Sequence, residues 1–503
     1  MPLLDIIREE KLIQLARERY DPNLSDAELK VLRDSASSED PPVPDNNAPR
    51  PEVRADFLRW LATDPEATMH IDPKGIRVYA ATIPGMLNLQ ECLVRSTLCF
   101  FNCKFLEIIN FYSADMRSIY FFDSLLYGGI FADGVKIHGA LFLRSIQSEG
   151  EIRLLGARID HDIDCSDAKL VVKGIAFGMD GAKIGGYIFL VNGFESEGEI
   201  RLVGAEIGGD LVFRGGKVTE VYCQNIIVKG DLIWQGIKKP ENTYFTLVGA
   251  NVKNFRDDLE SWPNKENIIL DGLVYEELTL HEHSSENNIK ASRLSPELPL
   301  DARERIKWLM LQQEDRRAEA QPWMQLSKHL ESKGDRKGAK HVVFKYRCLQ
   351  AQESWLLRRW WRMFFAWMEE NPLRIGWTIF GTLVLGTLVF AGAMRSGAMI
   401  ETAQIQSKQD ESIKFISAHY PSFQPIIYTL ENAVPLVKLG IDERWIPDVQ
   451  HKPQPWFPQI GWLDGLKWFN SYGFLVWFRW FLIVWGWVQA TIFAAAVADR
   501  FKK

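Results

Sequence analysis

The sequence predicts a mainly β soluble part, a parallel β-solenoid of about nine coils with helical caps, joined to a two-span α-helical membrane domain. Two observations carry this prediction. Residues 70–280 repeat with a period of about 23 residues, which is typical of a solenoid. Residues 375–394 and 481–498 carry no charge, and about 20 apolar residues of helix cross a bilayer core of about 30 Å. Two buried core helices are the alternative, but neither run has the polar face of a globular helix.

The N-terminal segment, residues 1–65, is predicted to be a helical cap. It opens on a charged, helix-like stretch without the apolar core of a secretory signal. Ser25 and Glu28 have the spacing of a capping box, and residues 54–61 are amphipathic. Residues 35–51 are rich in Ser, Pro, Asp and Asn, which indicates a loop.

The solenoid is predicted over residues 66–285. DGVKIHGALFL at 133–143 returns as DGAKIGGYIFL at 180–190, and SEGEIRLLGA at 148–157 returns as SEGEIRLVGA at 196–205. A small residue recurs with steps of 22, 25, 23, 45 and 23, so that the step of 45 covers two coils; the positions are Gly134, Gly156, Gly181, Gly204, Gly249 and Gly272. Weaker half-coil echoes lie at Cys92, Cys103 and Ala114.

Within each coil, apolar residues alternate with period two, which predicts strands. The alternation directs four side chains inward: Ile159, Ile184, Ile207 and Leu211. The pairs Gly185-Gly186 and Gly208-Gly209 are expected at corners, with positive φ as their reason. Both open ends of such a rod need caps.

After the solenoid, residues 286–354 are predicted to be a helical segment with a helix pair broken at residues 332–335. Residues 355–371 place Arg358, Arg359 and Arg362 among aromatic residues, as in an amphipathic helix at a membrane interface. The first span is placed at 372–397, an extracytoplasmic or re-entrant loop domain at 398–471, and the second span at 472–499.

Composition narrows the class of protein. The net charge of −6 and the pI near 6.0 argue against a nucleic-acid partner. Thirteen of the 18 Trp residues lie at or after Trp355, where they would serve as interface anchors. The six Cys residues form no CxxC pair and no zinc spacing, which favours buried thiols in a reducing cytoplasm.

Three segments of the chain are similar to those of a known family: the repeat GAEIGGDL at 204–211, the segment QPWMQL at 321–326, and YTLENAVPLVKLG at 428–440 followed by WIP. Together they resemble a bacterial family of repeat-plus-membrane proteins commonly labelled membrane-associated oxidoreductase. The resemblance covers residues from about 50 to the end, and implies the architecture and a membrane location. That family usually has Tyr-Ser-Leu-Asp where this chain has YTLE, and Gly-Gln-Glu where it has Gly440-Ile-Asp-Glu443.

The oxidoreductase label implies a cofactor, but the residues supply no motif for one. There is no G-x-G-x-x-G element between a strand and a helix, and no haem, iron–sulfur or redox CxxC signature. The sequence therefore favours a non-enzymatic protein, with no predicted catalytic, cofactor-binding or metal-binding residue.

Two patterns in the solenoid have alternative interpretations. His281 and His283 would lie on one face of a strand, as metal ligands or as a solvated solenoid exit. A repeated acidic edge is either a solvated face or an attractor for a cation or a basic partner; it comprises Glu149, Glu151, Glu195, Glu197 and Glu199.

The segment between the spans is predicted to be the functional centre of the membrane part. Pro425 and Pro435 bracket a helix of about ten residues, too short to span. Arg479, in the first turns of span two, either reaches the interface or pairs with a carboxylate near Glu431 or Asp442. The predicted functional motif comprises Tyr428, Glu431, Pro435, Asp442, Glu443, Trp445 and Arg479.

Other residues in the spans are candidates for helix packing. Thr378, Thr382 and Gly386 form a stripe of small residues in span one, and Gln489 and Thr491 lie near the middle of span two.

The leading functional prediction is a multi-pass protein of the bacterial inner membrane with both termini cytosolic. Near the spans, Lys and Arg number seven on the terminal side and five on the loop side. The solenoid would be an interaction or sensing surface for a protein partner, coupled to the two-span anchor. The alternatives are a pore formed by a homo-oligomer and gated by the solenoid, and a membrane-associated oxidoreductase.

Overall fold

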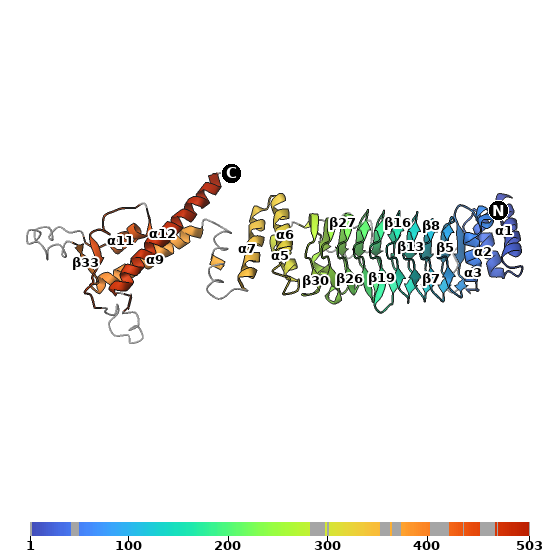
Figure 1. The fold of residues 1–503 in the computed structure, drawn as a ribbon, viewed down its shortest axis with the longest axis horizontal. Coiled ribbons are helices and arrows are strands. Elements are labelled where there is room, and N and C mark those ends of the chain that lie inside the picture. The colour runs from blue at the N-terminus through green and yellow to red at the C-terminus, as the bar shows by residue number, and fades with distance from the viewer. Residues whose placement is uncertain are drawn as a thin grey trace, which may run out of the picture. The chain divides into compact units, whose positions relative to one another are not determined.

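The chain forms two compact units, Met1–Gln350 and Ala351–Lys503, in a computed structural model (Figure 1). The structure describes residues 3–41, 50–281, 297–298, 301–352, 363–364, 374–402, 422–435, 437–452, 468–469 and 471–501. The predicted interfacial helix at 355–371 falls almost wholly outside these residues.

The first unit is built around a parallel β-solenoid of nine turns, which confirms the predicted fold (Figure 1). One strand of every turn contributes to a nine-stranded sheet: β3 (Leu87–Asn88), β7 (Ile109–Asn110), β11 (Ile130–Phe131), β15 (Ile152–Arg153), β19 (Ile175–Gly178), β23 (Glu199–Arg201), β26 (Glu220–Tyr222), β28 (Tyr244–Thr246) and β30 (Ile268–Ile269). A six-stranded sheet flanks it: β2 (Thr82–Ile83), β6 (Lys104–Phe105), β10 (Leu125–Leu126), β14 (Gln147–Ser148), β18 (Lys169–Leu170) and β22 (Glu195–Ser196).

The remaining strands form a 17-stranded sheet that covers two sides of each turn. Its members are β1 (Ile76–Tyr79), β4 (Leu93–Val94), β5 (Leu98–Phe101), β8 (Asp115–Met116), β9 (Ile119–Phe122), β12 (Lys136–Ile137), β13 (Leu141–Arg144), β16 (Arg158–Ile159), β17 (Ile163–Asp164), β20 (Lys183–Ile184), β21 (Ile188–Val191), β24 (Glu206–Ile207), β25 (Leu211–Arg214), β27 (Ile227–Gln235), β29 (Asn251–Asp258), β31 (Val274–His281) and β32 (Glu297–Leu298). Short 3₁₀ helices, η1 (Pro240–Asn242) and η2 (Leu259–Ser261), lie in the later turns.

Stacked apolar side chains fill the solenoid. Ile159, Ile184 and Ile207 occupy one register position on β16, β20 and β24, and all are buried. Leu211 is buried in the same way on β25. The inward direction predicted for these four residues is therefore confirmed.

The recurring small residue marks a corner with left-handed backbone. Gly204 and Gly249 have φ of 67° and 66°, and Asn225 lies between them with φ of 54°. The step of 45 residues is thus two turns, with asparagine at the middle position, as αL conformation allows. Asn102, with φ of 53°, belongs to a second left-handed row, which accounts for the half-coil echo at the next residue, Cys103.

The expected reason for the glycine pairs is wrong. Gly185, Gly186, Gly208 and Gly209 are absent from the positive-φ glycines. A Cβ on Gly208 would instead lie 2.2 Å from the carbonyl oxygen of Gly185, and one on Gly185 would lie 2.1 Å from that of Asp160. Glycine is needed here because successive turns approach backbone to backbone at this corner.

Gly208→Ala should therefore destabilise the solenoid, because the methyl group meets a neighbouring backbone that has little room to move. We expect a loss of about 1–3 kcal/mol in the free energy of unfolding. Gly204→Asn is the control, because nothing lies within 4 Å of its added Cβ and Asn225 occupies the equivalent corner. Urea denaturation of both variants measures the difference; equal midpoints would contradict the close-approach explanation.

The N-terminal end of the solenoid is covered by four helices: α1 (Leu3–Arg19), α2 (Asp26–Ala36), α3 (Ala55–Thr63) and α4 (Pro65–Met69). The capping box of Ser25 and Glu28 is present at the start of α2. The backbone N–H of Val53 donates to the carbonyl of Thr82, and the N–H of Thr82 donates to Pro51. These bonds close the exposed edge of β2.

The C-terminal end is covered by α5 (Ala302–Met310), α6 (Ala320–Ser332) and α7 (Arg336–Gln352), with the predicted break at 332–335 between α6 and α7. Glutamine side chains bond the backbone of the last turn. The side-chain oxygens of Gln312 and Gln321 accept the N–H groups of Leu270 and Gly272. Gln325 donates to the carbonyl of Tyr275.

A buried ion pair joins this cap to the solenoid. The guanidinium of Arg305 donates two hydrogen bonds of 2.6 Å to the carboxylate of Asp257, and both side chains are fully buried. Arg305 also lies over the rings of Trp262 and Trp308. Burial raises the pKa of Asp257, and the attraction of Arg305 opposes that rise.

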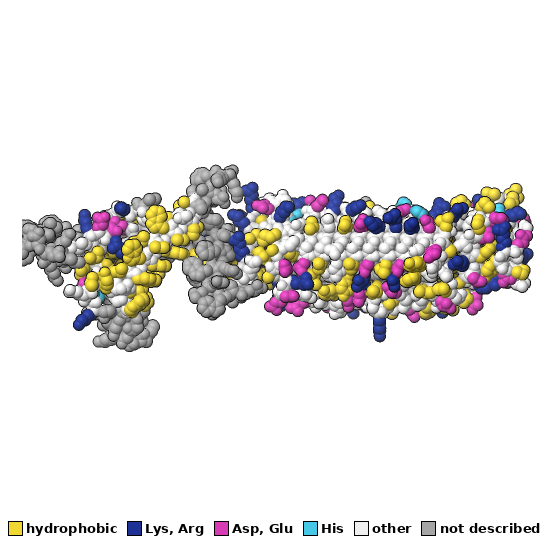
Figure 2. All heavy atoms as spheres, in the orientation of Figure 1, with side chains coloured by type: hydrophobic (Ala, Val, Ile, Leu, Met, Phe, Trp, Pro, Cys, Tyr) yellow, Lys and Arg dark blue, Asp and Glu magenta, His cyan; other side chains and the backbone are white. Residues whose placement is uncertain are grey.

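The second unit contains two helices that are long and apolar enough to cross a membrane, α9 (Ile375–Arg395) and α12 (Tyr472–Phe501). In α12, the stretch that meets this test is Tyr472–Ala494. The short helix α11 (Pro425–Ala433) lies between them in sequence, and β33 (Met399–Glu401) pairs antiparallel with β34 (Trp445–Pro447). Figure 2 shows apolar side chains gathered over this part of the chain.

Candidate functional site between the apolar helices

Helix α11 packs closely against both long helices because each presents a glycine to it. A Cβ on Gly386 of α9 would lie 2.3 Å from the side chain of Thr429. A Cβ on Gly486 of α12 would lie 2.0 Å from the carbonyl oxygen of Ala433. Of the stripe of small residues predicted for the first apolar helix, Gly386 therefore contacts α11.

The Glu431 carboxylate is enclosed by backbone donors. Four consecutive N–H groups, those of residues 439–442, donate to its two oxygens, three of them at 2.8–3.0 Å. Gly440, with φ of 77°, gives this loop the curvature that makes the N–H groups converge. Burial raises the pKa of Glu431, but the four backbone hydrogen bonds outweigh it and hold that pKa below its usual value.

Arg479 connects α12 to both neighbouring segments. Its Nε donates to the side-chain oxygen of Asn432 at 2.8 Å, and its Nη2 lies 3.2 Å from the Asp442 carboxylate. Of the two alternatives for Arg479, the structure shows pairing, and the partner is Asp442 rather than Glu431. Burial and the nearby Glu431 carboxylate raise the pKa of Asp442, and Arg479 partly offsets that rise.

Tyr428 forms the apolar floor of this network. It is fully buried, Phe390 meets its ring edge-to-face at 4.7 Å, and the Arg479 guanidinium lies 5.8 Å from the ring centroid. Its hydroxyl makes no hydrogen bond with the residues that the structure describes. Burial raises the pKa of Tyr428 to about 12, so the phenol stays protonated.

The other predicted motif residues lie around this network. Trp445 is on β34, and its ring packs against Phe423. Pro435 follows the end of α11, as predicted. Glu443 is exposed, and its backbone carbonyl accepts the Thr402 hydroxyl. The structure thus brings Tyr428, Glu431, Asp442 and Arg479 together. Glu443 contributes its backbone carbonyl to the fold, but its side chain takes no part in this network.

A second polar contact joins the two long helices. The hydroxyl of Thr382 receives the side-chain amide of Gln489 at 3.1 Å and the indole N–H of Trp485 at 3.2 Å. Thr382 in turn donates to the carbonyl of Thr378. Thr491 donates only to a carbonyl of its own helix among the residues described, so it takes no part in this contact.

Sequence reasoning missed two parts of the site. Asn432 is the direct partner of Arg479, yet a lone asparagine in a helix carries no distinctive signal. The four backbone donors of residues 439–442 are invisible to a search for side chains. Gly440 was the available signal, because glycine adopts left-handed backbone, which a sharply turning loop requires, without steric cost.

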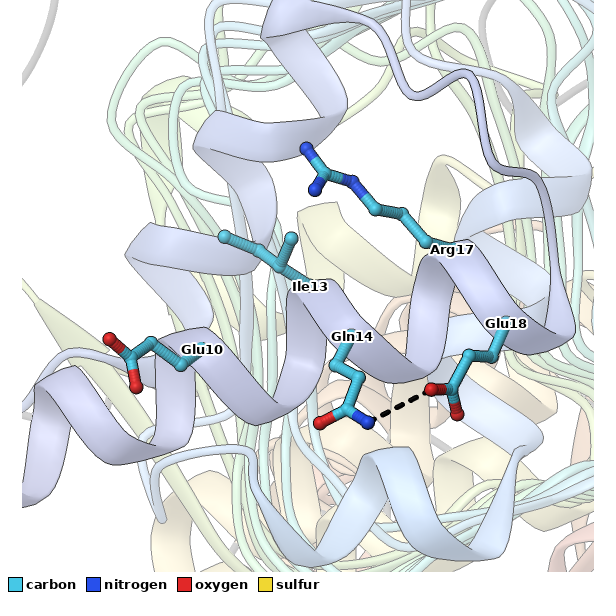
Figure 3. A pocket seen from close by; sticks show the side chains of 5 residues that line it. All are labelled: Glu10, Ile13, Gln14, Arg17 and Glu18. Carbon is cyan, nitrogen blue, oxygen red and sulfur yellow. Dashed lines mark hydrogen bonds between the residues drawn. The ribbon is translucent and has the colours of Figure 1, made fainter.

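Among the residues that the structure describes, the other candidate sites do not form a similar network of polar side chains. His281 is buried on β31, and His283 lies outside the described residues. Within the described part of the chain, no three His, Cys, Asp or Glu side chains come together as metal ligands. A shallow hollow on the outer face of α1 is lined by Glu10, Ile13, Gln14, Arg17 and Glu18 (Figure 3).

Comparisons with known proteins add no relative: no family model, no curated protein and no solved structure matches this chain. The resemblance to the membrane-associated oxidoreductase label therefore stays a prediction.

Glu431→Gln should loosen the loop of residues 439–442, because an amide offers one acceptor oxygen and turns an N–H₂ group toward N–H donors. We expect these four amides to exchange hydrogen roughly 10- to 100-fold faster, as a loss of about 1.5–3 kcal/mol implies. Hydrogen exchange by mass spectrometry makes the measurement. Glu443→Gln, an exposed neighbour, is the control, and equal exchange in both variants would contradict the role given to Glu431.

Proposed function

We propose that the chain is an integral membrane protein in which α9 and α12 cross the bilayer and the solenoid is an interaction or sensing surface anchored there. One observation carries the membrane assignment. Only 22% and 28% of the apolar windows of α9 and α12 are buried within the folded chain, whereas the core helix of a soluble protein is mostly buried. Trp377, Leu388, Trp480 and Val484 are among the exposed apolar residues on these helices. Such a surface is stable in lipid and is a liability in water.

The polar network supports a specific role for the inter-span segment. A charged residue inside a membrane helix is costly unless it is paired, and Arg479 is paired with Asp442 and Asn432. The network thereby links α11, α12 and the loop that follows α11. We infer that it holds the inter-span segment as one folded element, and that this segment is the functional centre of the membrane part. A pore would need several copies of the chain, because two spans cannot line one.

Fractionation of cells that express the full chain tests the membrane assignment. The chain should pellet with membranes, resist extraction at alkaline pH, and dissolve in detergent. Release at alkaline pH without detergent would overturn the proposal. Conductance of the purified protein in bilayers, together with its oligomeric state in detergent, tests the pore.

Orientation in a bacterial inner membrane is tested separately, with both termini proposed to be cytosolic. A Ser407→Cys variant should react with an impermeant thiol reagent in intact cells, and a Lys173→Cys variant on the solenoid should react only after lysis. The opposite pattern would reverse the topology.

A further inference from the structure

One edge of the solenoid, between the six-stranded and nine-stranded sheets, changes character along its length. Backbone hydrogen bonds stack a first row of residues in register, from Leu106 over residue 84 to Glu197 over residue 171. The row consists of Pro84, Leu106, Tyr127, Glu149, Val171 and Glu197. A parallel row, each member preceding a strand of the nine-stranded sheet or starting one, consists of Met86, Ile108, Gly129, Glu151, Ile175, Glu199 and Glu220.

The first three turns of this edge are apolar. Met86, Leu106, Ile108 and Tyr127 are 42%, 43%, 37% and 39% exposed, so four large apolar side chains face water together. Glu107 is the acidic residue among them, and Lys104 lies over the ring of Tyr127. Contiguous exposed apolar side chains are a feature of protein interaction surfaces.

The later turns of the same edge are acidic. Glu149 and Glu197 are exposed, and their carboxylates make no hydrogen bond or ion pair with any other residue that the structure describes, so their charge faces solvent. Glu151, Glu199 and Glu220 continue the second row. The turn between them carries Val171, Lys173 and Ile175 instead, so the acidic residues lie in the turns on either side of it.

We propose that this polarised edge is a docking surface for a protein segment with large apolar side chains in one half and Lys or Arg in the other. The proposal rests on the proposed function of the solenoid as an interaction surface, and it specifies the partner. The acidic turns of the edge would attract the Lys and Arg half of the partner segment through charge complementarity. The exposed apolar cluster would bind the segment's apolar half. The edge spans seven turns, from Met86 to Glu220, so its length is about 29 Å at about 4.8 Å per turn.

A helix of about 19 residues would match that length, at about 1.5 Å per residue. The apolar half supplies affinity through buried surface, while the acidic half fixes the direction of the segment and makes binding dependent on salt. An anionic lipid surface fits less well, because Glu149 and Glu197 would be repelled by its headgroups.

The test uses the full chain in lipid nanodiscs and a labelled 19-residue helical peptide with leucines in one half and lysines in the other. Fluorescence anisotropy should show saturable binding that weakens at least tenfold when salt rises from low to high. Glu149→Lys with Glu197→Lys, and separately Leu106→Ser with Tyr127→Ser, should each weaken binding at least tenfold. A peptide with glutamates in place of the lysines should not bind.

Matched controls keep the inference falsifiable. Glu18→Lys with Glu241→Lys makes the same charge change away from the edge, and Leu93→Ser removes an apolar side chain that is more exposed, from another side of the solenoid. Both should bind the peptide as the unmodified chain does. No binding by the unmodified chain, or equal loss in edge and control variants, would overturn the inference. Membrane fractionation is unaffected by either result, so the anchoring proposal stands or fails on its own.

Discussion

Ile207→Asp should lower the stability of the solenoid by more than about 4 kcal/mol, the largest effect we expect from one substitution. Ile207 is fully buried on β24 and stacks between Ile184 and Val228 of the adjacent turns. A carboxylate at this position would lose its hydration with no donor to replace it, so it would have to be protonated or drag water into the core. Both outcomes also remove the apolar contacts of the isoleucine.

The control for this prediction lies one turn further along the solenoid. Ile227 occupies the outward register position next to Glu206 and is 40% exposed. Ile227→Asp makes the same chemical change on the solvent side and should cost at most about 1 kcal/mol. Urea denaturation of the full chain in detergent, followed by circular dichroism, gives the midpoints. Similar midpoints for the two variants would contradict the inward direction of Ile207.

Arg305→Met should destabilise the junction of solenoid and C-terminal cap by about 3–5 kcal/mol, because it leaves the Asp257 carboxylate buried and unpaired. The Trp262 indole still donates to Asp257, but one neutral donor does not replace a bidentate guanidinium. Thermal melting measures the loss of stability, and limited proteolysis measures whether the chain after α5 is cleaved more readily. Arg303→Met, an exposed change in the same helix, should have little effect.

The double variant Asp257→Leu with Arg305→Met tests whether the lost stability comes from the unpaired charge or from other contacts of these two side chains. Because neither charge then remains in the core, much of the lost stability should return. A double variant less stable than Arg305→Met alone would show that the carboxylate has another structural role, such as its bond to Trp262.

Structural features that recur in every turn could be predicted from the sequence, whereas contacts that occur only once could not. The solenoid could be predicted because each turn has nearly the same environment. The same residue type therefore recurs at equivalent core positions, as at Ile159, Ile184 and Ile207. The pair of Arg305 and Asp257 is 48 residues apart and occurs once, so no period reveals it. The glycine pairs were placed at corners correctly but explained wrongly, since close approach depends on the neighbouring turn and not on the local φ.

The candidate site was predictable in its residues but not in its pairings. Glu431, Asp442 and Arg479 were identified because charge near an apolar span is costly. Which acid meets Arg479 depends on the loop of residues 439–442 folding back onto Glu431, and that fold is set by backbone N–H groups. Side-chain chemistry alone cannot reveal a site whose donors belong to the main chain.

The glutamine contacts at the C-terminal cap bear on how the solenoid avoids fibre growth. A bare last turn would offer its N–H and C=O groups as a template on which another chain could add strands without limit. Gln312, Gln321 and Gln325 occupy several of those groups with side-chain amides, which imitate a further turn but lack the backbone continuity to present a new one. The rod therefore terminates itself, and its length becomes a property encoded by the number of repeats.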